Sequence, residues 1–248
     1  MKLKDKVAIV TGAASGFGKG IAELYASEGA KVCVSDINGQ GARDVANEIG
    51  SQAIHVAADV SQQADVSNMV VETVSAFGGV DIMVNNAGYT HRNQPMLDVD
   101  EEQFDRIFAV NVKAIYLAAK EVVPIMEQRG GGSIITTAST AGVRPRPGLV
   151  WYNSSKGAAI SMTKSMAIEL APKKIRVNAI NPVAGDTPML AQFMGEDTPE
   201  IREKFVSTIP LGRFSLPDDI ANVALFLADP ASNFLTGLAI EVDGGRCI

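Results

Sequence analysis

The sequence predicts a doubly wound α/β fold, in which a parallel sheet is covered by helices on both faces. Short and almost wholly apolar runs, such as Val7–Val10 and Val80–Val84, alternate with longer segments of helical period. Strands that are buried on both faces have this continuous apolar character. Because strand and helix patterns alternate along the whole chain, the strands are expected to be parallel and linked by crossover helices.

Seven strands and six helices are expected. The strands are predicted at 7–10, 31–35, 53–57, 80–84, 132–137, 175–180 and 238–242. The helices are predicted at 18–28, 41–49, 63–77, 101–127, 152–171 and 217–228. Residues 183–216 break this alternation, since they contain Gly, Pro, Met and Phe without a clean period. A long segment of this kind in a single domain (1–248) predicts a substrate lid or binding loop, with a plain surface insertion as the alternative.

Composition limits the classes of protein that fit. The 248 residues, 46% of them hydrophobic, can form one large core. A net charge of −6 argues against nucleic acid or an anionic membrane as the main partner. Residues 1–6 form a charged lead-in to a strand, and no apolar run is long enough to cross a bilayer. Cys33 and Cys247 lack metal-ligand spacing, so no metal site is expected. Because cysteines are so few, we expect a protein of the reducing cytoplasm.

A glycine-rich turn, TGAASGFG at 11–18, joins the first strand to the first helix. Gly12 permits a sharp turn, Gly16 lets the main chain approach a pyrophosphate, and Gly18 allows close helix–sheet packing. The N-terminus of the helix offers free N–H groups to phosphates. A tight turn without a ligand is the alternative, but the position between strand and helix favours a Rossmann-type dinucleotide site.

Asp36 ends the second predicted strand, 18 positions after Gly18. A carboxylate there can accept hydrogen bonds from the ribose hydroxyls of an adenosine, and it would repel a 2′-phosphate. Ile37 and Ser15 are neutral and offer no cation to such a phosphate. These positions therefore predict NAD as the cofactor, in preference to NADP. A second, compatible role for Asp36 is to cap the following helix.

Tyr152 and Lys156 stand four residues apart on one predicted helix, so they share a face. An ammonium beside a phenol favours the phenolate and lowers its pKa, which would suit acid–base catalysis. Such a pair is common by chance on solvated helices. Ser139, however, follows a strand 13 residues upstream, at the edge of the sheet where parallel folds bind ligands.

Together these motifs resemble the short-chain dehydrogenase/reductase family over essentially the whole chain. The matching motifs, in order, are TGAASGFG at 11–18, Asp59-Val60, NNAG at 85–88, Asn111, Ser139, Tyr152–Lys156, Asn181-Pro182 and Val242–Gly245.

The resemblance implies a role for each catalytic position. Tyr152 would exchange a proton with the substrate oxygen, and Lys156 would lower the pKa of that tyrosine and hold the nicotinamide ribose. Ser139 would hydrogen-bond the substrate oxygen. Asn111 would hold a water in the proton relay, although an Asn within a helix often binds main chain or water instead.

The resemblance also implies the contacts of the cofactor. The expected residues are Gly12, Ser15, Gly16, Phe17, Gly18, Asp36, Ile37, Asp59, Val60, Asn86, Ala87, Gly88, Tyr152, Lys156, Pro182, Val183, Gly185 and Thr187. The chain departs from the family pattern after Pro182, where the family usually has glycine and, two residues later, an aliphatic residue. Here these positions are Val183 and Gly185, which changes the allowed main-chain dihedrals beside the nicotinamide.

The implied activity is NAD-dependent interconversion of a secondary alcohol and a ketone. A 3-oxoacyl carrier-protein reductase and a non-catalytic NAD-binding regulator are the alternatives, and the intact Ser139, Tyr152 and Lys156 weigh against the regulator. The substrate is left open, as a polar ketone, a polyol or a small acid. Candidate pocket residues, each with a plain surface or packing role as the alternative, are His91, Arg92, Arg144, Arg146, Trp151, Met189, Phe193 and Met194.

The family resemblance also implies a homo-oligomer, and a tetramer is expected. In relatives, the helices equivalent to 101–127 and 152–171 pack across a subunit interface. Here these helices carry Ile115, Leu117, Ile160 and Met162. The alternative is that these side chains face only their own sheet.

Overall fold

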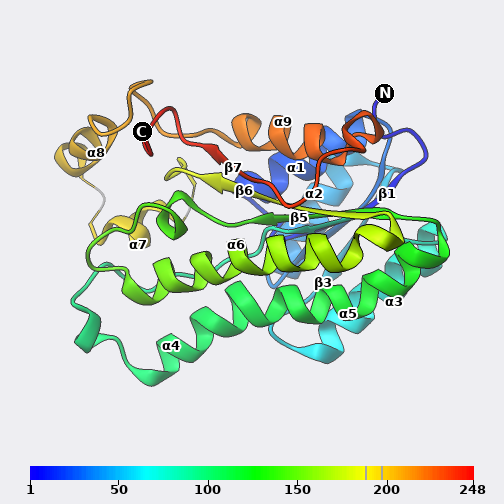
Figure 1. Cartoon of the computed structure of the whole chain (residues 1–248), viewed down its shortest axis with the longest axis horizontal. Helices are drawn as coiled ribbons and strands as arrows, with labels where there is room; N and C mark the ends of the chain where they lie inside the picture. Colours follow the sequence, from blue (N-terminus) through cyan, green and yellow to red (C-terminus); the bar gives the residue numbers. More distant parts are fainter. Residues whose placement is uncertain (188, 197) are drawn as a thin grey trace.

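The described residues of the computed structural model, 1–187, 189–196 and 198–248, contain a seven-stranded parallel sheet in the order β3-β2-β1-β4-β5-β6-β7 (Figure 1). The strands are β1 (Val7–Thr11), β2 (Lys31–Asp36), β3 (Ala53–Ala57), β4 (Ile82–Asn85), β5 (Gly132–Thr137), β6 (Ile175–Pro182) and β7 (Ala239–Val242). The order reverses between β1 and β4, so the predicted doubly wound fold is confirmed. The fourth strand begins at Ile82 instead of the expected Val80.

Helices cover both faces of the sheet. They are α1 (Gly16–Ser27), α2 (Gly39–Ile49), α3 (Gln63–Phe77), α4 (Glu101–Phe108), α5 (Ala114–Gln128), α6 (Val150–Leu170), α7 (Leu190–Met194), α8 (Pro199–Val206) and α9 (Pro217–Ala228). In Figure 1, α1, α2 and α9 lie on one face, and α3, α5 and α6 lie on the other.

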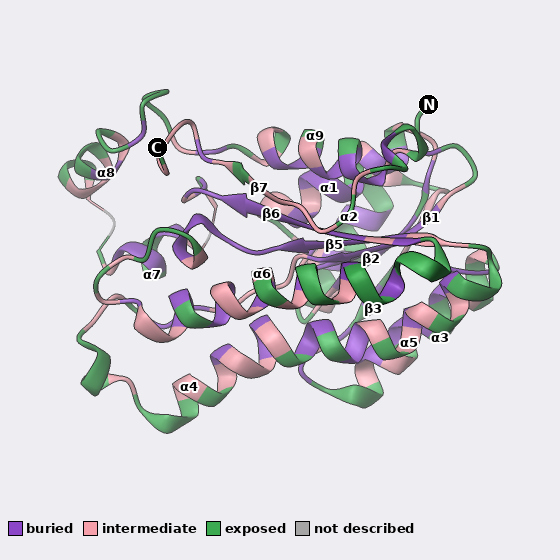
Figure 2. Ribbon diagram, viewed as in Figure 1, coloured by how far each residue is buried: buried purple, intermediate pink, exposed green. Residues whose placement is uncertain are grey.

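Successive residues of the central strands feed two separate cores. Ala8 and Val10 of β1 pack into the cluster that includes α1, α2 and α9, whereas Ile9 packs into the cluster that includes α3 and α5. Side chains of a strand alternate between the two faces of a sheet, so a strand with a core on each side must be apolar throughout. Figure 2 shows the result as a buried sheet between helices whose outer faces are exposed.

The predicted helix 101–127 is interrupted. Between α4 and α5, residues Ala109–Lys113 form a π-helical turn, η2, with Asn111 at its centre. A π turn accommodates an extra residue without ending the helix, and such turns are frequent at functional sites. The backbone stays helical where the turn joins α4 and α5, and no Gly or Pro lies in 101–113, so the sequence pattern indicated one uninterrupted helix.

The segment 183–216 is partly helical, because it contains α7 and α8. The apolar side chains of Leu190, Phe193 and Phe205 pack with Val183 and with Tyr152. Each helix is too short to show a period in the sequence. This segment lies over the carboxyl ends of β5 and β6 (Figure 1). Residues 188 and 197 of the segment lie outside the described residues.

The four apolar residues expected at a subunit interface pack within the chain. Ile115 and Leu117 are buried, and Ile160 and Met162 pack on the same core cluster as Ile115. Ile115 and Leu117 thus follow the alternative given above, whereas Ile160 and Met162 are only half-buried, and the oligomer stays a prediction. Other large apolar side chains are exposed, among them Tyr116, Ile168, Phe226, Phe234 and Ile248. Within the described part of the chain, no helix combines the length and apolar character that crossing a membrane requires.

Candidate active site

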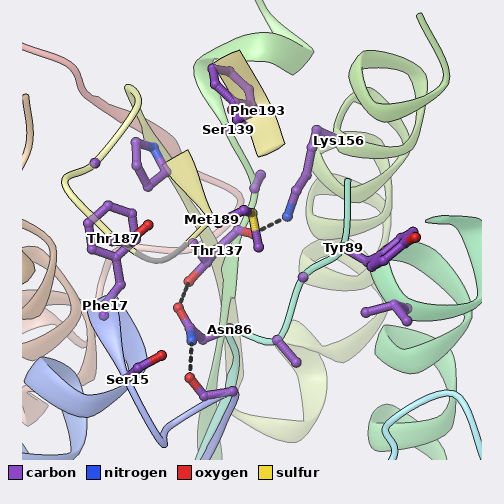
Figure 3. Close-up of a pocket in the computed structure, with 18 of the residues that line it drawn as sticks. Ser15, Phe17, Asn86, Tyr89, Thr137, Ser139, Lys156, Thr187, Met189 and Phe193 are labelled. Atoms are coloured by element: carbon purple, nitrogen blue, oxygen red, sulfur yellow. Dashed lines mark hydrogen bonds between the residues drawn. The ribbon is translucent and has the colours of Figure 1, made fainter. Parts of the chain in front are cut away.

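A cavity of about 380 Å³ opens at the carboxyl ends of the strands, where the strand order reverses (Figure 3). Ligands of open α/β sheets bind at this position, because loops there diverge to the two faces. The cavity brings together nearly all the predicted site residues. Those that line it are Gly12, Ser15, Gly16, Phe17, Asp36, Ile37, Asp59, Val60, Asn86, Ala87, Gly88, Ser139, Tyr152, Lys156, Pro182, Val183, Gly185 and Thr187.

Gly18 and Asn111 are the predicted site residues that do not line this cavity. Gly18 acts from behind the turn: a Cβ there would lie 2.2 Å from the carbonyl oxygen of Gly12 and 2.5 Å from Nδ2 of Asn86. Any other residue would push α1 away from the sheet. The expected close packing at Gly18 is thus present, and its effect on a ligand is indirect.

Asp36 joins the glycine turn to the start of α2. Its carboxylate accepts hydrogen bonds from the main-chain N–H groups of Ala14 (3.0 Å) and Asn38 (2.9 Å). The helix cap is Asn38, whose side chain accepts from Gly41 N, so the suggested capping role of Asp36 is wrong. A carboxylate has about four acceptor positions, and the two left on Asp36 can serve hydroxyl groups in the cavity.

Asp59 is held by a cation that the sequence did not single out. Its carboxylate accepts hydrogen bonds from Ser61 N (2.9 Å) and from Arg106 Nη1 (2.9 Å). Partial burial alone would raise the pKa of Asp59, but the hydrogen bonds from Ser61 and Arg106 hold that pKa below its usual value. Arg106 also lines the cavity. In the sequence it resembles any solvated charge on a helix, so no signal identified it.

The side chain of Asn86 connects three strand ends across the floor of the cavity. Its Nδ2 donates to the carbonyl oxygens of Thr11 (3.0 Å) and Gly12 (3.1 Å), and its Oδ1 accepts from Thr137 Oγ1 (3.1 Å). The Thr137 carbonyl oxygen accepts from Lys156 Nζ at 2.8 Å (Figure 3). A continuous line of hydrogen bonds therefore runs from the glycine turn to the predicted catalytic lysine. Thr137 was missed because its contribution is largely through its main chain.

Tyr152 and Lys156 lie at the other end of the cavity, on α6, and only 6% and 5% of their surfaces are exposed. The Nζ of Lys156 is 5.8 Å from the centre of the Tyr152 ring. Ser139 follows β5 and shares a hydrogen bond with Tyr152. The Ser139 Oγ also accepts from Ala141 N (3.0 Å), which leaves its proton available as a donor.

Burial moves the pKa values of the two residues in opposite directions. It raises the pKa of Tyr152 to about 12, with the Ser139 hydrogen bond acting against this, and it lowers the pKa of Lys156 to about 8. Loss of hydration dominates both shifts, so the expected lowering of the phenol pKa by Lys156 stays a prediction. At pH 7 this site holds a neutral phenol beside a protonated amine.

Asn111 lies behind the cavity wall, where its side chain holds the main chain of Tyr89. Its Oδ1 accepts from Tyr89 N (2.9 Å), and its Nδ2 donates to Tyr89 O (2.8 Å) and to Ser155 Oγ (3.0 Å). These contacts match the main-chain role given above as the alternative. A relay water at Asn111 stays a prediction. Tyr89, which lines the cavity, is a further residue that the sequence did not single out.

The unusual order of Val183 and Gly185 has a packing explanation. A Cβ at Gly185 would lie 2.2 Å from Cζ of Phe17 and 3.2 Å from Ser215 Oγ. The aromatic ring in the glycine-rich turn thus occupies the space that an aliphatic side chain at 185 would need. Val183 is buried in the cluster that contains Tyr152 and Phe193.

The candidate substrate residues separate into those near the cavity and those elsewhere. Met189 and Phe193 line it, with the Phe193 ring 5.8 Å from that of Tyr152. Trp151 instead packs on Phe104 and donates to Met96 O (3.2 Å).

The other candidates lie outside this cavity as well. His91 is fully buried, and its Nδ1 contacts Arg92 O at 2.7 Å. Arg92 and Met194 line a separate groove. Arg144 and Arg146 line a smaller cavity next to Phe193.

Comparison with known proteins identifies the class. Residues 12–246 match the family model described as enoyl-(acyl carrier protein) reductase. The chain is 50% identical to 4-formylbenzenesulfonate dehydrogenase of Comamonas testosteroni over the full length of both, and 39% identical to 7α-hydroxysteroid dehydrogenase of Escherichia coli K12 over 99% of this chain and 95% of the relative.

A solved structure agrees over the same length. It is that of 3-ketoacyl-(acyl-carrier-protein) reductase from Brucella melitensis complexed with NADH, with a TM-score of 0.94 and 49% identity over 99% of this chain and 100% of the other. The chain thus belongs to the short-chain dehydrogenase/reductase family of oxidoreductases.

We predict that Phe17 and Gly185 are energetically coupled. Gly185→Ala should lower the free energy of unfolding by about 1–3 kcal/mol, since the new Cβ displaces the Phe17 ring. Phe17→Leu shortens the opposing side chain. It should lower the free energy of unfolding much less in the Gly185→Ala variant than in the wild type. Urea unfolding of the wild type, both single variants and the double variant measures this coupling. Purely additive effects would contradict it.

Proposed function

We propose that this protein is an NAD(H)-dependent oxidoreductase that interconverts a secondary alcohol and a ketone, with Tyr152 as the acid and base. One observation carries the proposal: Ser139, Tyr152 and Lys156 converge at one end of a cavity whose other end holds the glycine turn and Asp36. Both halves of the reaction, a cofactor groove and a proton-exchanging group, therefore share one cavity.

The residues of the cavity fit a nicotinamide dinucleotide. Gly12 and Gly16 have φ angles of +63° and +55°, which favour glycine. Because neither residue has a side chain, a pyrophosphate can approach the main chain at the N-terminus of α1. Asp36 has acceptor capacity for the adenosine ribose, and Lys156 has further N–H groups for the second ribose. The bound nicotinamide would supply or accept the hydride. The Brucella melitensis relative, which was solved with NADH, supports this assignment.

In ketone reduction, the protein's task is to place and protonate the carbonyl oxygen. The Ser139 hydroxyl would donate a hydrogen bond to that oxygen, because a carbonyl oxygen can only accept, while the bond from Ala141 N holds Oγ in place. The neutral Tyr152 phenol would transfer its proton to the oxygen as the alcohol forms. The Lys156 ammonium, which is fixed by Thr137 O, stabilises the negative charge left on the phenol.

The relatives' names leave the substrate open. The 50% identical relative is named for an aldehyde that carries a sulfonate, and another is named for a hydroxysteroid. The Brucella melitensis structure is named a 3-ketoacyl carrier-protein reductase, so that activity is the second candidate. A panel of ketones assayed with NADH and NADPH separates the two. The intact Ser139, Tyr152 and Lys156 argue against a regulator without turnover.

We further propose a cytoplasmic homo-oligomer, with a tetramer as the expected state. The exposed Phe234 and Ile248 supply apolar surface for such contacts, with 97% and 103% relative exposure.

Tyr152→Phe should reduce kcat by about 10²–10⁴-fold, because the hydroxyl is the proton donor. NADH binding, measured by fluorescence titration, should stay close to that of the wild type, since the adenosine contacts lie elsewhere. Lys156→Ala should weaken both turnover and binding. Tyr116→Phe, on an exposed surface of α5, is the matched control. Wild-type turnover in the purified Tyr152 variant would refute the assignment.

The kcat/KM for ketone reduction should fall as the pH rises through about 8. This quantity reports ionisations of the free enzyme. Lys156 loses its charge near pH 8, whereas Tyr152 keeps its proton up to about pH 12. The falling limb thus belongs to the lysine. A profile that is flat between pH 6 and 10 would show that the Lys156 charge is not needed.

NAD(H) should be preferred over NADP(H) by tenfold or more in kcat/KM. Hydrogen bonds from ribose hydroxyls to the Asp36 carboxylate contribute about 1.5–3 kcal/mol, and 1.4 kcal/mol corresponds to a factor of ten. Asp36→Ala should reduce this preference, because it removes the repulsion between the carboxylate and the 2′-phosphate. Adding Ile37→Arg should be needed to reverse the preference in favour of NADP(H). Steady-state kinetics with both coenzymes and one ketone test this. Equal values in the wild type would mean that Asp36 does not contact the ribose.

A further inference from the structure

Three guanidinium groups meet beside the active site. Arg144 and Arg146 lie after β5, and Arg246 lies near the C-terminus, yet all three line one small cavity. Arg144 Nη1 donates a hydrogen bond to the main-chain oxygen of Arg246. The guanidinium of Arg146 is 4.6 Å from the centre of the Phe205 ring, and that of Arg246 is 5.8 Å from it. Two positive charges therefore share one aromatic ring.

This arginine cluster (Arg144, Arg146 and Arg246) has no anionic partner among the described residues. The other side chains that line its cavity are neutral. Asp243, the acidic side chain nearest in sequence to Arg246, accepts hydrogen bonds from the main-chain N–H groups of Gly245 and Cys247. Like charges brought together and partly removed from water are costly unless an anion joins them. The burial of Arg146 and the charge of Arg246 accordingly lower the pKa of Arg146.

Arg146 also has an unsatisfied hydrogen-bond donor. Its Nη1 is buried and has no partner among the residues that the structure describes. The position of the Arg146 main chain is fixed, since its carbonyl oxygen accepts from Asn153 Nδ2 (2.8 Å) on α6, next to Tyr152. A buried N–H that is held in place and left unpaired indicates a ligand that completes it.

The cluster adjoins the catalytic end of the main cavity. Phe193 and Ala184 line both cavities. The Phe193 ring lies 5.8 Å from the ring of Tyr152 and 4.8 Å from the guanidinium carbon of Arg146. The space among the arginines is about 10 Å³, so an incoming group must displace the Phe193 ring or the exposed Arg144 side chain. A short aliphatic or aromatic spacer can bridge the distance from Tyr152 to Arg146.

We propose that the arginine cluster binds a carboxylate or sulfonate group of the substrate while the substrate carbonyl lies against Tyr152 and Ser139. This inference rests on the proposed function, because it places the reacting carbon in that site. Guanidinium groups match the paired oxygens of such anions, and an anion would complete the free Nη1 of Arg146. The substrate class is thus an anionic ketone or alcohol with its charge at the far end of a short spacer.

The test uses a matched pair of ketones, 4-acetylbenzenesulfonate and 4-acetylbenzenesulfonamide, which differ mainly in charge. Calorimetric titration of the protein loaded with oxidised NAD, which cannot reduce a ketone, gives their dissociation constants, and a separate assay follows NADH oxidation. The variants are Arg146→Gln and Arg246→Gln. Lys164→Gln, on the exposed face of α6, makes the same change in net charge away from the cluster. Arg146→Lys, which keeps charge but loses the planar fork, serves as a conservative variant.

The wild type should bind the sulfonate at least tenfold more tightly than the sulfonamide. Arg146→Gln and Arg246→Gln should each remove most of this preference and leave sulfonamide binding within about twofold, and Lys164→Gln should retain it. If Arg146→Gln fails to fold because Arg146 no longer stacks on the Phe193 and Phe205 rings, the Arg246→Gln variant still tests the proposal.

Equal affinities in the wild type, or a preference that survives both arginine variants, would overturn the subsite. Absence of binding by both ketones would overturn it as well. Sulfonate-selective binding without NADH oxidation would instead count against the proposed function and support the subsite.

Discussion

The site depends on hydrogen bonds that fix the ends of three strands at the point where the strand order reverses. Parallel strands end there with unpaired main-chain groups, because the following loops leave for opposite faces. Asn86 satisfies the carbonyl oxygens of Thr11 and Gly12 and receives the Thr137 hydroxyl. Thr11 Oγ1 in turn accepts from Asn86 N and Ala87 N, both at 3.1 Å. Only a residue without a side chain fits at Gly18, which packs directly on this network. The glycine turn and the catalytic strand are therefore positioned by the same few polar atoms.

The same network holds Lys156 in a buried position, and burial separates the acid–base properties of Tyr152 and Lys156. Its Nζ is buried and bonded to Thr137 O, and its remaining N–H groups face the cavity. Without a carboxylate partner, burial weakens the charged form of the lysine and strengthens the neutral form of Tyr152. A neutral phenol next to an ammonium is the arrangement that a proton donor to a carbonyl oxygen requires. The reverse reaction needs additional positive charge near the phenol, because its pKa must fall before it can accept a proton.

The sequence predicts the fold and most of the site for identifiable reasons. Strands with a core on each face must be apolar throughout, so β1, β2 and β4 stand out. One edge of a parallel sheet brings together the glycine turn, Asp36, Ser139, Tyr152 and Lys156, and this is why their spacings can be recognised.

Residues that act through the main chain, or through a partner brought close by folding, have no recognisable pattern in the sequence. Arg106 is one surface charge among many until Asp59 is placed beside it, and Thr137 contributes a carbonyl oxygen. The π turn at Asn111 joins two α-helices without a Gly or Pro that would mark it in the sequence. The pKa of Tyr152 depends on burial, which residue spacing does not report.

Aromatic packing links Tyr152 to the segment 183–216. Phe193 meets Tyr152 edge-on and meets Phe205 edge-on at 6.4 Å, and Phe205 stacks on Phe214 at 5.6 Å. This row of rings closes the cavity on the side away from the cofactor groove, and the arginine cluster lies against it. A substrate that displaces Phe193 must disturb the whole row, since each ring supports the next. The groove formed by the glycine turn, Asp36 and Asn86 is independent of this row. Changes at Phe193, Phe205 or Phe214 can thus alter the row without touching the glycine turn, whereas changes at Gly185 or Thr187 would reach that turn through Phe17 and Gly16.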